Sequence, residues 1–188
     1  MLRKILAVSL MSVTSIAVAD TLDIGLSNST AQFKYGVPSS IASKSEIYAE
    51  LMYNDKNSII GGVGLLVAND ELNVPGLTIG IGAKAVAATI KETPSRTNAS
   101  AVALGAQVRY ELPVERRVAF AGEVYYAPQI ITFGDADYYQ QFGARAEFSI
   151  SPQMQVYAGY RKTWFGLKNL NSDVTLINGP HVGVQLTF

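Results

Sequence analysis

Apolar and polar positions alternate strictly near the end of the chain, in residues 179–188 (GPHVGVQLTF). The apolar set on the even positions consists of Val182, Val184, Leu186 and Phe188. The odd positions between them carry Gly183, Gln185 and Thr187, which are small or polar. A period of two is typical of a β-strand with one apolar and one polar face.

Nine further segments show the same alternation and are separated by residues that favour turns. They are residues 21–27, 30–37, 45–53, 58–68, 77–88, 101–112, 118–126, 138–150 and 154–164. Alternation is weakest in 58–68, where we assign Ile59, Val63, Leu65 and Val67 to the outward face. The pattern therefore predicts ten strands.

A terminal apolar strand at the edge of a sheet would invite pairing with other chains. Residues 182–188 carry no charge that would prevent such pairing, so this strand needs a neighbour on both sides. Closure of the sheet supplies the second neighbour. We predict an all-β fold, an antiparallel up-and-down transmembrane β-barrel of ten strands. An eight-stranded barrel, with the first two segments merged or left outside, is the alternative.

The start of the chain predicts export. Arg3 and Lys4 precede an apolar run over residues 5–18, and Ala17 and Ala19 are small residues of the kind that signal peptidase reads. We expect a cleaved signal peptide over residues 1–19 and a single barrel domain over 20–188. A membrane anchor is less well supported because the run is shorter than a spanning helix requires.

Composition narrows the class of protein. Without Arg3 and Lys4, 13 basic residues stand against 15 acidic ones, which argues against a nucleic-acid partner. The chain has no cysteine, so it has neither disulfides nor thiolate metal sites. After the signal peptide, no run of 18 apolar residues is present that could form a helical span. Apolar residues on alternate positions fit strands that face lipid.

The connections predict an orientation, because outer-membrane barrels have short periplasmic turns and longer external loops. In the C-terminal half, PVER and SPQ are short, whereas KETPSRTNAS, QIITFGDAD and LKNLNSDVTLINGP are long. The N-terminal half fits less well, because the external turns SNS and NDKN are shorter than the periplasmic connections GVPSSIASK and NDELNVPG. In this orientation the lipid-facing aromatic residues gather at the strand ends and would form two girdles. The external girdle would consist of Tyr53, Tyr126, Tyr138 and Trp164, and the periplasmic girdle of Tyr35, Tyr110, Phe148 and Phe188.

Several stretches resemble the YfaZ family of Gram-negative outer-membrane proteins. They are GLTIGIGAKAV, FAGEVYYAPQI, YQQFGARAEFSI, VYAGYRKTWF and the closing GPHVGVQLTF. The resemblance implies location in the outer membrane and a barrel architecture, and it implies no agreed activity. The terminal strand with Val182, Val184, Leu186 and Phe188 also resembles the signal that the barrel-assembly machinery reads in many outer-membrane barrels.

If the apolar set faces lipid, charged residues face the lumen. We predict a lumen charge network of Lys34, Glu46, Glu50, Lys84, Arg109, Glu123, Arg145, Glu147 and Arg161, with Asp23 on the same face. Buried charges must pair or contact water. Because side chains can just fill an eight-stranded barrel, we expect a structural barrel that presents its loops. A narrow pore for ions or small solutes is the alternative, since glycines at 80, 82, 105, 143, 159 and 183 reduce the side-chain volume.

A catalytic role at the external rim is the third and weakest possibility. His181 is the one histidine of the chain, and we expect it on the inward face near the external end of the last strand. No GxSxG, HExxH, phosphate-loop or calcium-loop motif accompanies it. We therefore expect no enzymatic activity, no cofactor and no metal. The expected partners are outer-membrane lipids, lipopolysaccharide and, during insertion, the assembly machinery.

Overall fold

The computed structural model describes residues 19–188 except 43, 56–57, 71, 93–94 and 169–172. The predicted signal peptide, apart from Ala19, lies outside the described residues. The strands are β1 (Thr21–Ser27), β2 (Thr30–Ser39), β3 (Ser45–Asn54), β4 (Ile59–Asn69), β5 (Leu77–Glu92), β6 (Ser95–Glu111), β7 (Val118–Ala127), β8 (Thr132–Gly134), β9 (Ala136–Ser151), β10 (Met154–Leu167) and β11 (Asp173–Thr187). A short 3-10 helix, η1 (Gln129–Ile131), precedes β8. In the described part, no helix is long and apolar enough to cross a membrane.

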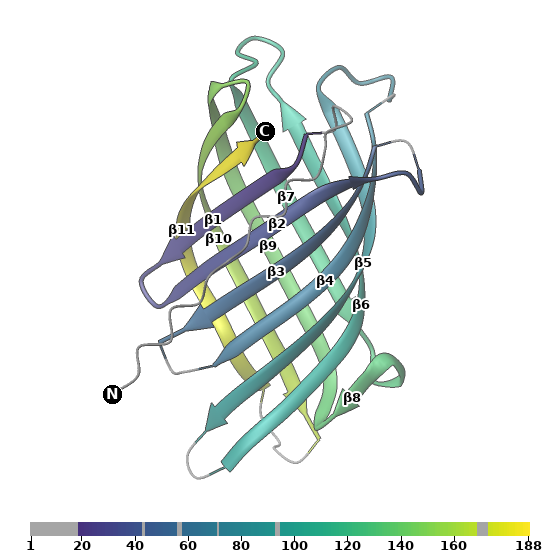
Figure 1. The fold of residues 1–188 in the computed structure, drawn as a ribbon, viewed down its shortest axis with the longest axis vertical. Helices are drawn as coiled ribbons and strands as arrows, with labels where there is room; N and C mark the ends of the chain where they lie inside the picture. Colours follow the sequence, from purple (N-terminus) through teal and green to yellow (C-terminus); the bar gives the residue numbers. More distant parts are fainter. Residues whose placement is uncertain (1–18, 43, 56–57, 71, 93–94, 169–172) are drawn as a thin grey trace, which may run out of the picture.

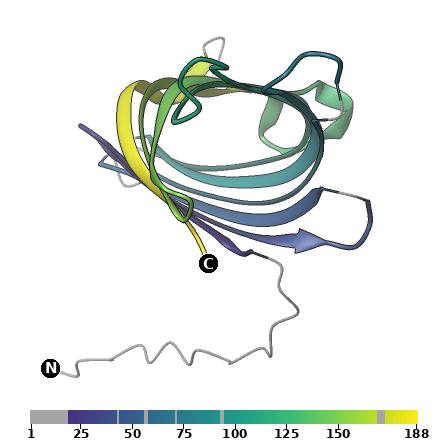
Figure 2. The same cartoon turned by 90° about the horizontal axis from the view of Figure 1, so that it is seen from above.

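Ten of these strands close into an antiparallel ring (Figures 1 and 2). Sequence neighbours pair along the wall, β7 pairs with β9, and β1 pairs with β11 to close it. The short β8 lies beside the ring and pairs with β6. The prediction of ten strands is confirmed, and the eight-stranded alternative is wrong because β1 and β2 each take a separate place in the wall.

The last strand is not an edge. β11 pairs with β10 on one side and with β1 on the other. The two chain ends meet, since the Asp20 N–H donates to the Phe188 carbonyl at 2.9 Å and the Phe188 N–H donates to the Asp20 carbonyl at 3.0 Å. We call the end of the barrel at Asp20 and Phe188 the terminal end, and the opposite end the hairpin end.

The two faces of the wall differ in polarity as the alternation predicts. Ile81, Leu104 and Val182 point outward and are about three-fifths to two-thirds exposed. Asp23 and Glu50, by contrast, are buried within the ring. A soluble barrel would have the reverse arrangement, so the outer surface fits contact with lipid.

Three predicted loops at the hairpin end are shorter than the sequence indicates. Residues 91–100, predicted as a loop, belong largely to β5 and β6, whose pairing continues to Glu92 and Ser95. Residues 129–137 contain η1, β8 and the start of β9, and β11 begins at Asp173 within the third predicted loop. The prediction of long loops here was wrong because polar residues such as Asn98 lie on the outer face while apolar neighbours such as Ala99 pack inside.

The wall is uneven in height. β1 to β4 have 7 to 11 residues, whereas β5, β6, β9, β10 and β11 have 14 to 17. β7 is short too, and β8 pairs with Ala99–Ala101 of β6 beyond the point where β7 leaves that strand. The long strands therefore extend the barrel at the hairpin end (Figure 1).

Candidate functional site

The candidate site is a cavity of about 360 Å³ inside the ring. Every strand of the ten-stranded ring contributes side chains to its wall. The cavity reaches from Thr21, Glu46 and Gln155 near the terminal end to Lys84 and His181 deeper in the barrel. We call it the lumen cavity.

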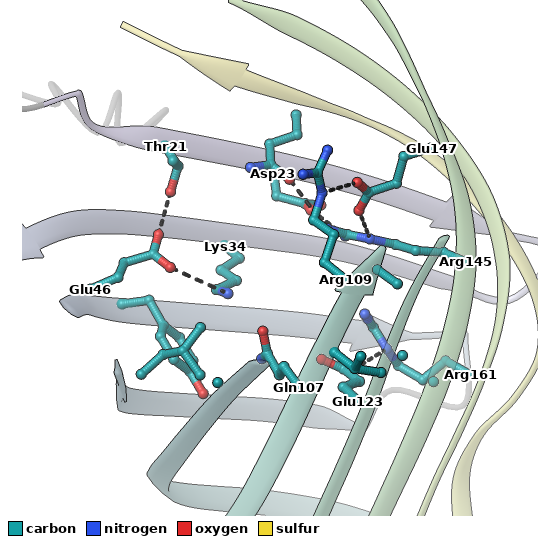
Figure 3. Close-up of a pocket in the computed structure, with 18 of the residues that line it drawn as sticks. Thr21, Asp23, Lys34, Glu46, Gln107, Arg109, Glu123, Arg145, Glu147 and Arg161 are labelled. Carbon is teal, nitrogen blue, oxygen red and sulfur yellow. Dashed lines mark hydrogen bonds and ion pairs between the residues drawn. The ribbon is translucent and has the colours of Figure 1, made fainter. Parts of the chain in front are cut away.

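A cluster of charges lies in the part of the lumen cavity towards the terminal end (Figure 3). Glu147 accepts hydrogen bonds from Nε of Arg109 and Nε of Arg145, both at 2.7 Å. Arg145 also pairs with Asp23 at 3.0 Å and lies over the ring of Tyr157. Two guanidinium groups thus share one buried carboxylate, which holds β6 and β9 together across β7.

A second cluster lies deeper and is more buried. The Lys84 ammonium donates to Glu50 at 2.8 Å and to Gln141 at 2.9 Å. Gln141 also donates to Glu123 at 2.7 Å, and Glu123 pairs with Arg161 at 3.2 Å. These polar contacts join β3, β5, β7, β9 and β10, so the network braces the wall from within.

A third pair lies on the short side of the wall. The Lys34 ammonium is 4.0 Å from Glu46 and lies 4.1 Å from the centre of the Tyr48 ring. The other oxygen of Glu46 accepts a hydrogen bond from Thr21 at 2.5 Å. Lys34 is therefore held by a ring face as well as by a carboxylate.

The structure brings all nine predicted lumen charges into the lumen cavity, and each belongs to an ion pair. Asp23, which we expected on the same face, lies with them. Glu111 was missed although it also pairs with Arg109. Its position two residues along the same strand from Arg109 was the available signal.

An apolar layer fills the lumen towards the hairpin end, which the sequence analysis did not predict. It consists of Met52, Ile60, Val86, Ala88, Ile90, Ala99, Ala101, Ala103, Tyr125, Ala127, Ala136, Tyr139, Phe165, Leu167, Val174, Leu176 and Ile177. Each of these residues is less than 9% exposed. The layer therefore places tightly packed apolar side chains between the lumen cavity and the hairpin end.

Tyrosines occupy the space that glycines leave free. Tyr48, Tyr125 and Tyr157 lie directly across from Gly64, Gly105 and Gly183 on neighbouring strands. A Cβ atom on Gly105 would lie 2.3 Å from the Tyr125 ring, and one on Gly183 would lie 2.3 Å from the Tyr157 ring. These glycines do not widen a channel, because each accommodates an aromatic ring that narrows the lumen.

Gly183→Ala is expected to lower the free energy of unfolding by about 1–3 kcal/mol, because the new methyl group overlaps Tyr157 and the Ile24 carbonyl. Urea titration of the folded barrel in lipid vesicles would measure this change. The matched control is Gly179→Ala on the same strand, where a Cβ atom meets nothing within 4 Å. An equal effect of both substitutions would contradict the packing of Tyr157 over Gly183.

His181 faces the lumen as predicted, but its predicted height was wrong. It lies in the middle of β11, beside Gly159 of β10 and beside Ser27, the last residue of β1, and not near the start of β11 at Asp173. The strand begins earlier than the pattern indicates, at Asp173, so His181 lies further from the start of the strand than predicted.

The ring centre of His181 lies 5.7 Å from that of Tyr157, and both ring nitrogens are buried without a hydrogen-bond partner among the described residues. Within that same part of the chain, no group of three acidic or histidine side chains could hold a metal ion.

The eight predicted girdle aromatics lie on the outward-facing positions of their strands. Tyr53, Tyr126 and Phe188 are about half exposed or more. Trp164 contacts Phe142 and the ammonium of Lys162 on the outer face. Tyr126 and Trp164 both lie beside Gln140, on opposite sides of β9. The arrangement is compatible with a girdle, whose role stays a prediction.

The chain is similar in sequence to known outer-membrane proteins. The model of a family described as "YfaZ precursor" matches residues 2–188. A curated relative, "Outer membrane protein YfaZ" of Escherichia coli (strain K12), is 30% identical over 139 residues, which is 72% of this chain and 71% of the relative. The word "precursor" agrees with the predicted signal peptide.

One solved structure superposes with a TM-score above 0.5, and it supports the fold alone. The outer membrane protease OmpT from Escherichia coli superposes with a TM-score of 0.51 at 10% identity, over 91% of this chain and 93% of that one. The KdgM porin has a TM-score of 0.45 at 12% identity, over 91% of this chain and 99% of that one. At these identities the likenesses transfer no activity.

Proposed function

The chain belongs to the YfaZ family of outer-membrane proteins, and from that premise we propose that it is a non-conducting barrel. Its lumen would serve to brace the wall, and its hairpin end would present a surface outside the cell. We further propose that the barrel has no catalytic activity.

The apolar layer is the observation that carries this proposal. An ion that crossed the lumen would have to leave the charged cavity and pass among side chains such as Met52, Ile90 and Phe165, which are at most 1% exposed. Transfer of an unpaired charge into such surroundings is very unfavourable. If the lumen were lined by polar residues alone, a narrow pore would be as well supported as a non-conducting barrel.

The proposed orientation puts the terminal end in the periplasm. The longer hairpin-end strands would then project outward past the lipid, with outer-face polar residues such as Asn98 beyond the aromatic positions. Val182, Val184 and Leu186 lie on the outer face of β11, which closes the ring with β1, and Phe188 directly follows this strand. Recognition of these residues by the assembly machinery, and contact of the wall with lipid and lipopolysaccharide, belong to the proposal.

Planar-bilayer recording tests the closed lumen. The reconstituted protein is expected to give no discrete conductance steps, while heat-modifiable migration on a gel verifies that the same preparation holds folded barrels. Steps whose size changes on Arg109→Ala or Arg161→Ala would overturn the proposal, since both side chains line the lumen cavity. The proposed absence of catalysis would be contradicted if cells with the unaltered protein had modified lipid A and cells with the His181→Ala variant had normal lipid A.

A further inference from the structure

The charged groups and the neutral amides of the lumen cavity differ in how fully they are engaged. The ten lumen charges are all in ion pairs, so their signs balance and their strongest contacts are internal. Three of the amides that line the cavity are less fully engaged. Gln155 has no hydrogen-bond partner among the described residues, and Gln107 and Gln185 each use only one of their two polar atoms.

All three amides line the lumen cavity. Gln155 of β10 lies directly beside Gln185 of β11, so that both point inward at the same height. Gln107 of β6 lies three strands away from β10 around the ring, at the side of the cavity shown in Figure 3. Together they offer unused donors and acceptors on two sides of one space.

The position of the amides makes them reachable from one end. Gln155 is the second residue of β10 at the terminal end, and Gln185 lies two residues before the end of β11. Among the cations of the two clusters, side-chain exposure falls from 29% for Arg109 and 24% for Arg145 to 10% for Arg161 and 1% for Lys84. A solute would therefore enter from the terminal end and stop at the apolar layer.

The charge pattern selects the class of solute. An anion or a cation would have to break an existing ion pair to gain one of its own, and a buried charge left behind is costly. A hydroxyl group both donates and accepts, so it can use the free amide atoms without disturbing the ion pairs. The cavity volume of about 360 Å³ lies within the range of small-molecule sites.

We propose that the lumen cavity is a binding chamber for a small neutral polyhydroxylated solute of the saccharide class, held by Gln107, Gln155 and Gln185. This binding role goes beyond the proposed bracing role of the lumen. It rests on the proposed function in one respect, because a closed lumen would keep the solute from passing through. Conductance measurements test the closed lumen and binding measurements test the chamber, so the failure of one proposal is distinguishable from the failure of the other.

Isothermal titration of the detergent-solubilised full barrel tests the chamber. The probes are neutral sucrose and glucose, with glucuronate and glucosamine as charged counterparts. At least one neutral sugar is expected to bind saturably with one site, and the charged sugars at least tenfold more weakly. Gln155→Leu is expected to weaken binding of the neutral sugar at least tenfold, because it removes a free amide from the cavity wall.

Gln153→Leu is the matched control, because this exposed glutamine lies in the turn before β10 and outside the cavity. It should leave binding unchanged. The proposal is overturned if no neutral sugar binds, if glucuronate or glucosamine binds as tightly as the neutral sugars, or if the two leucine substitutions act alike. Heat-modifiable migration of each variant verifies that the barrel is folded in every comparison.

Discussion

Replacing Lys84 with methionine is expected to lower the free energy of unfolding by about 3–5 kcal/mol, one of the two largest effects that the structure predicts. The Lys84 ammonium is buried and donates to both Glu50 and Gln141. Methionine keeps much of the volume but leaves the Glu50 carboxylate, whose side chain is only 5% exposed, without its cation. Urea titration of the barrel in lipid vesicles, followed by heat-modifiable gel migration, measures the change.

Two further variants separate a lost ion pair from a general effect of removing lysine. Lys44→Met removes an exposed partner of Asp70 at the terminal end and should leave the unfolding midpoint unchanged. Adding Glu50→Leu to Lys84→Met removes the stranded carboxylate and should recover part of the lost stability. If Lys84→Met were as stable as the unaltered protein, the network would not brace the wall.

The sequence pattern predicts which side of the wall each residue faces, because a strand has a period of two wherever it lies in a sheet. Lys34, Glu123 and Arg161 could therefore be assigned to the lumen in advance. Their partners could not, since these depend on which strands close the ring and in which register. Arg145 meets Asp23 across 122 positions of sequence only because β11 pairs with β1.

The apolar layer escaped prediction for a related reason. In residues 86–90 (VAATI) the inward Val86, Ala88 and Ile90 alternate with small outward residues, so both faces look weakly apolar. An alternation rule that assigns the apolar set to lipid has no means of finding apolar residues on the lumen side. Polar outer positions such as Asn98 then made the same region resemble a loop. Packing across the lumen, which no single strand reveals, determines this end of the barrel.

Phe165→Ala is expected to destabilise the barrel by about 3–5 kcal/mol, because it leaves a cavity in the middle of that layer. Phe165 is fully buried, and its ring lies 4.8 Å from the ring of Tyr139. Both residues belong to the apolar layer inside the ring, so the lost contacts cannot be replaced by lipid from outside the wall. The same urea titration in vesicles measures the loss.

Phe120→Ala provides the comparison, since Phe120 points outward on β7 and is about half exposed. This substitution removes the favourable free energy of transferring the Phe120 ring from water to lipid, which is about 1.5–3 kcal/mol. Lipid chains fill the vacated space, so no cavity remains. The difference between the two variants therefore isolates the packing of the apolar layer. If both variants lowered the free energy of unfolding equally, the apolar layer would be loosely packed. The main observation that supports a closed lumen would then be wrong.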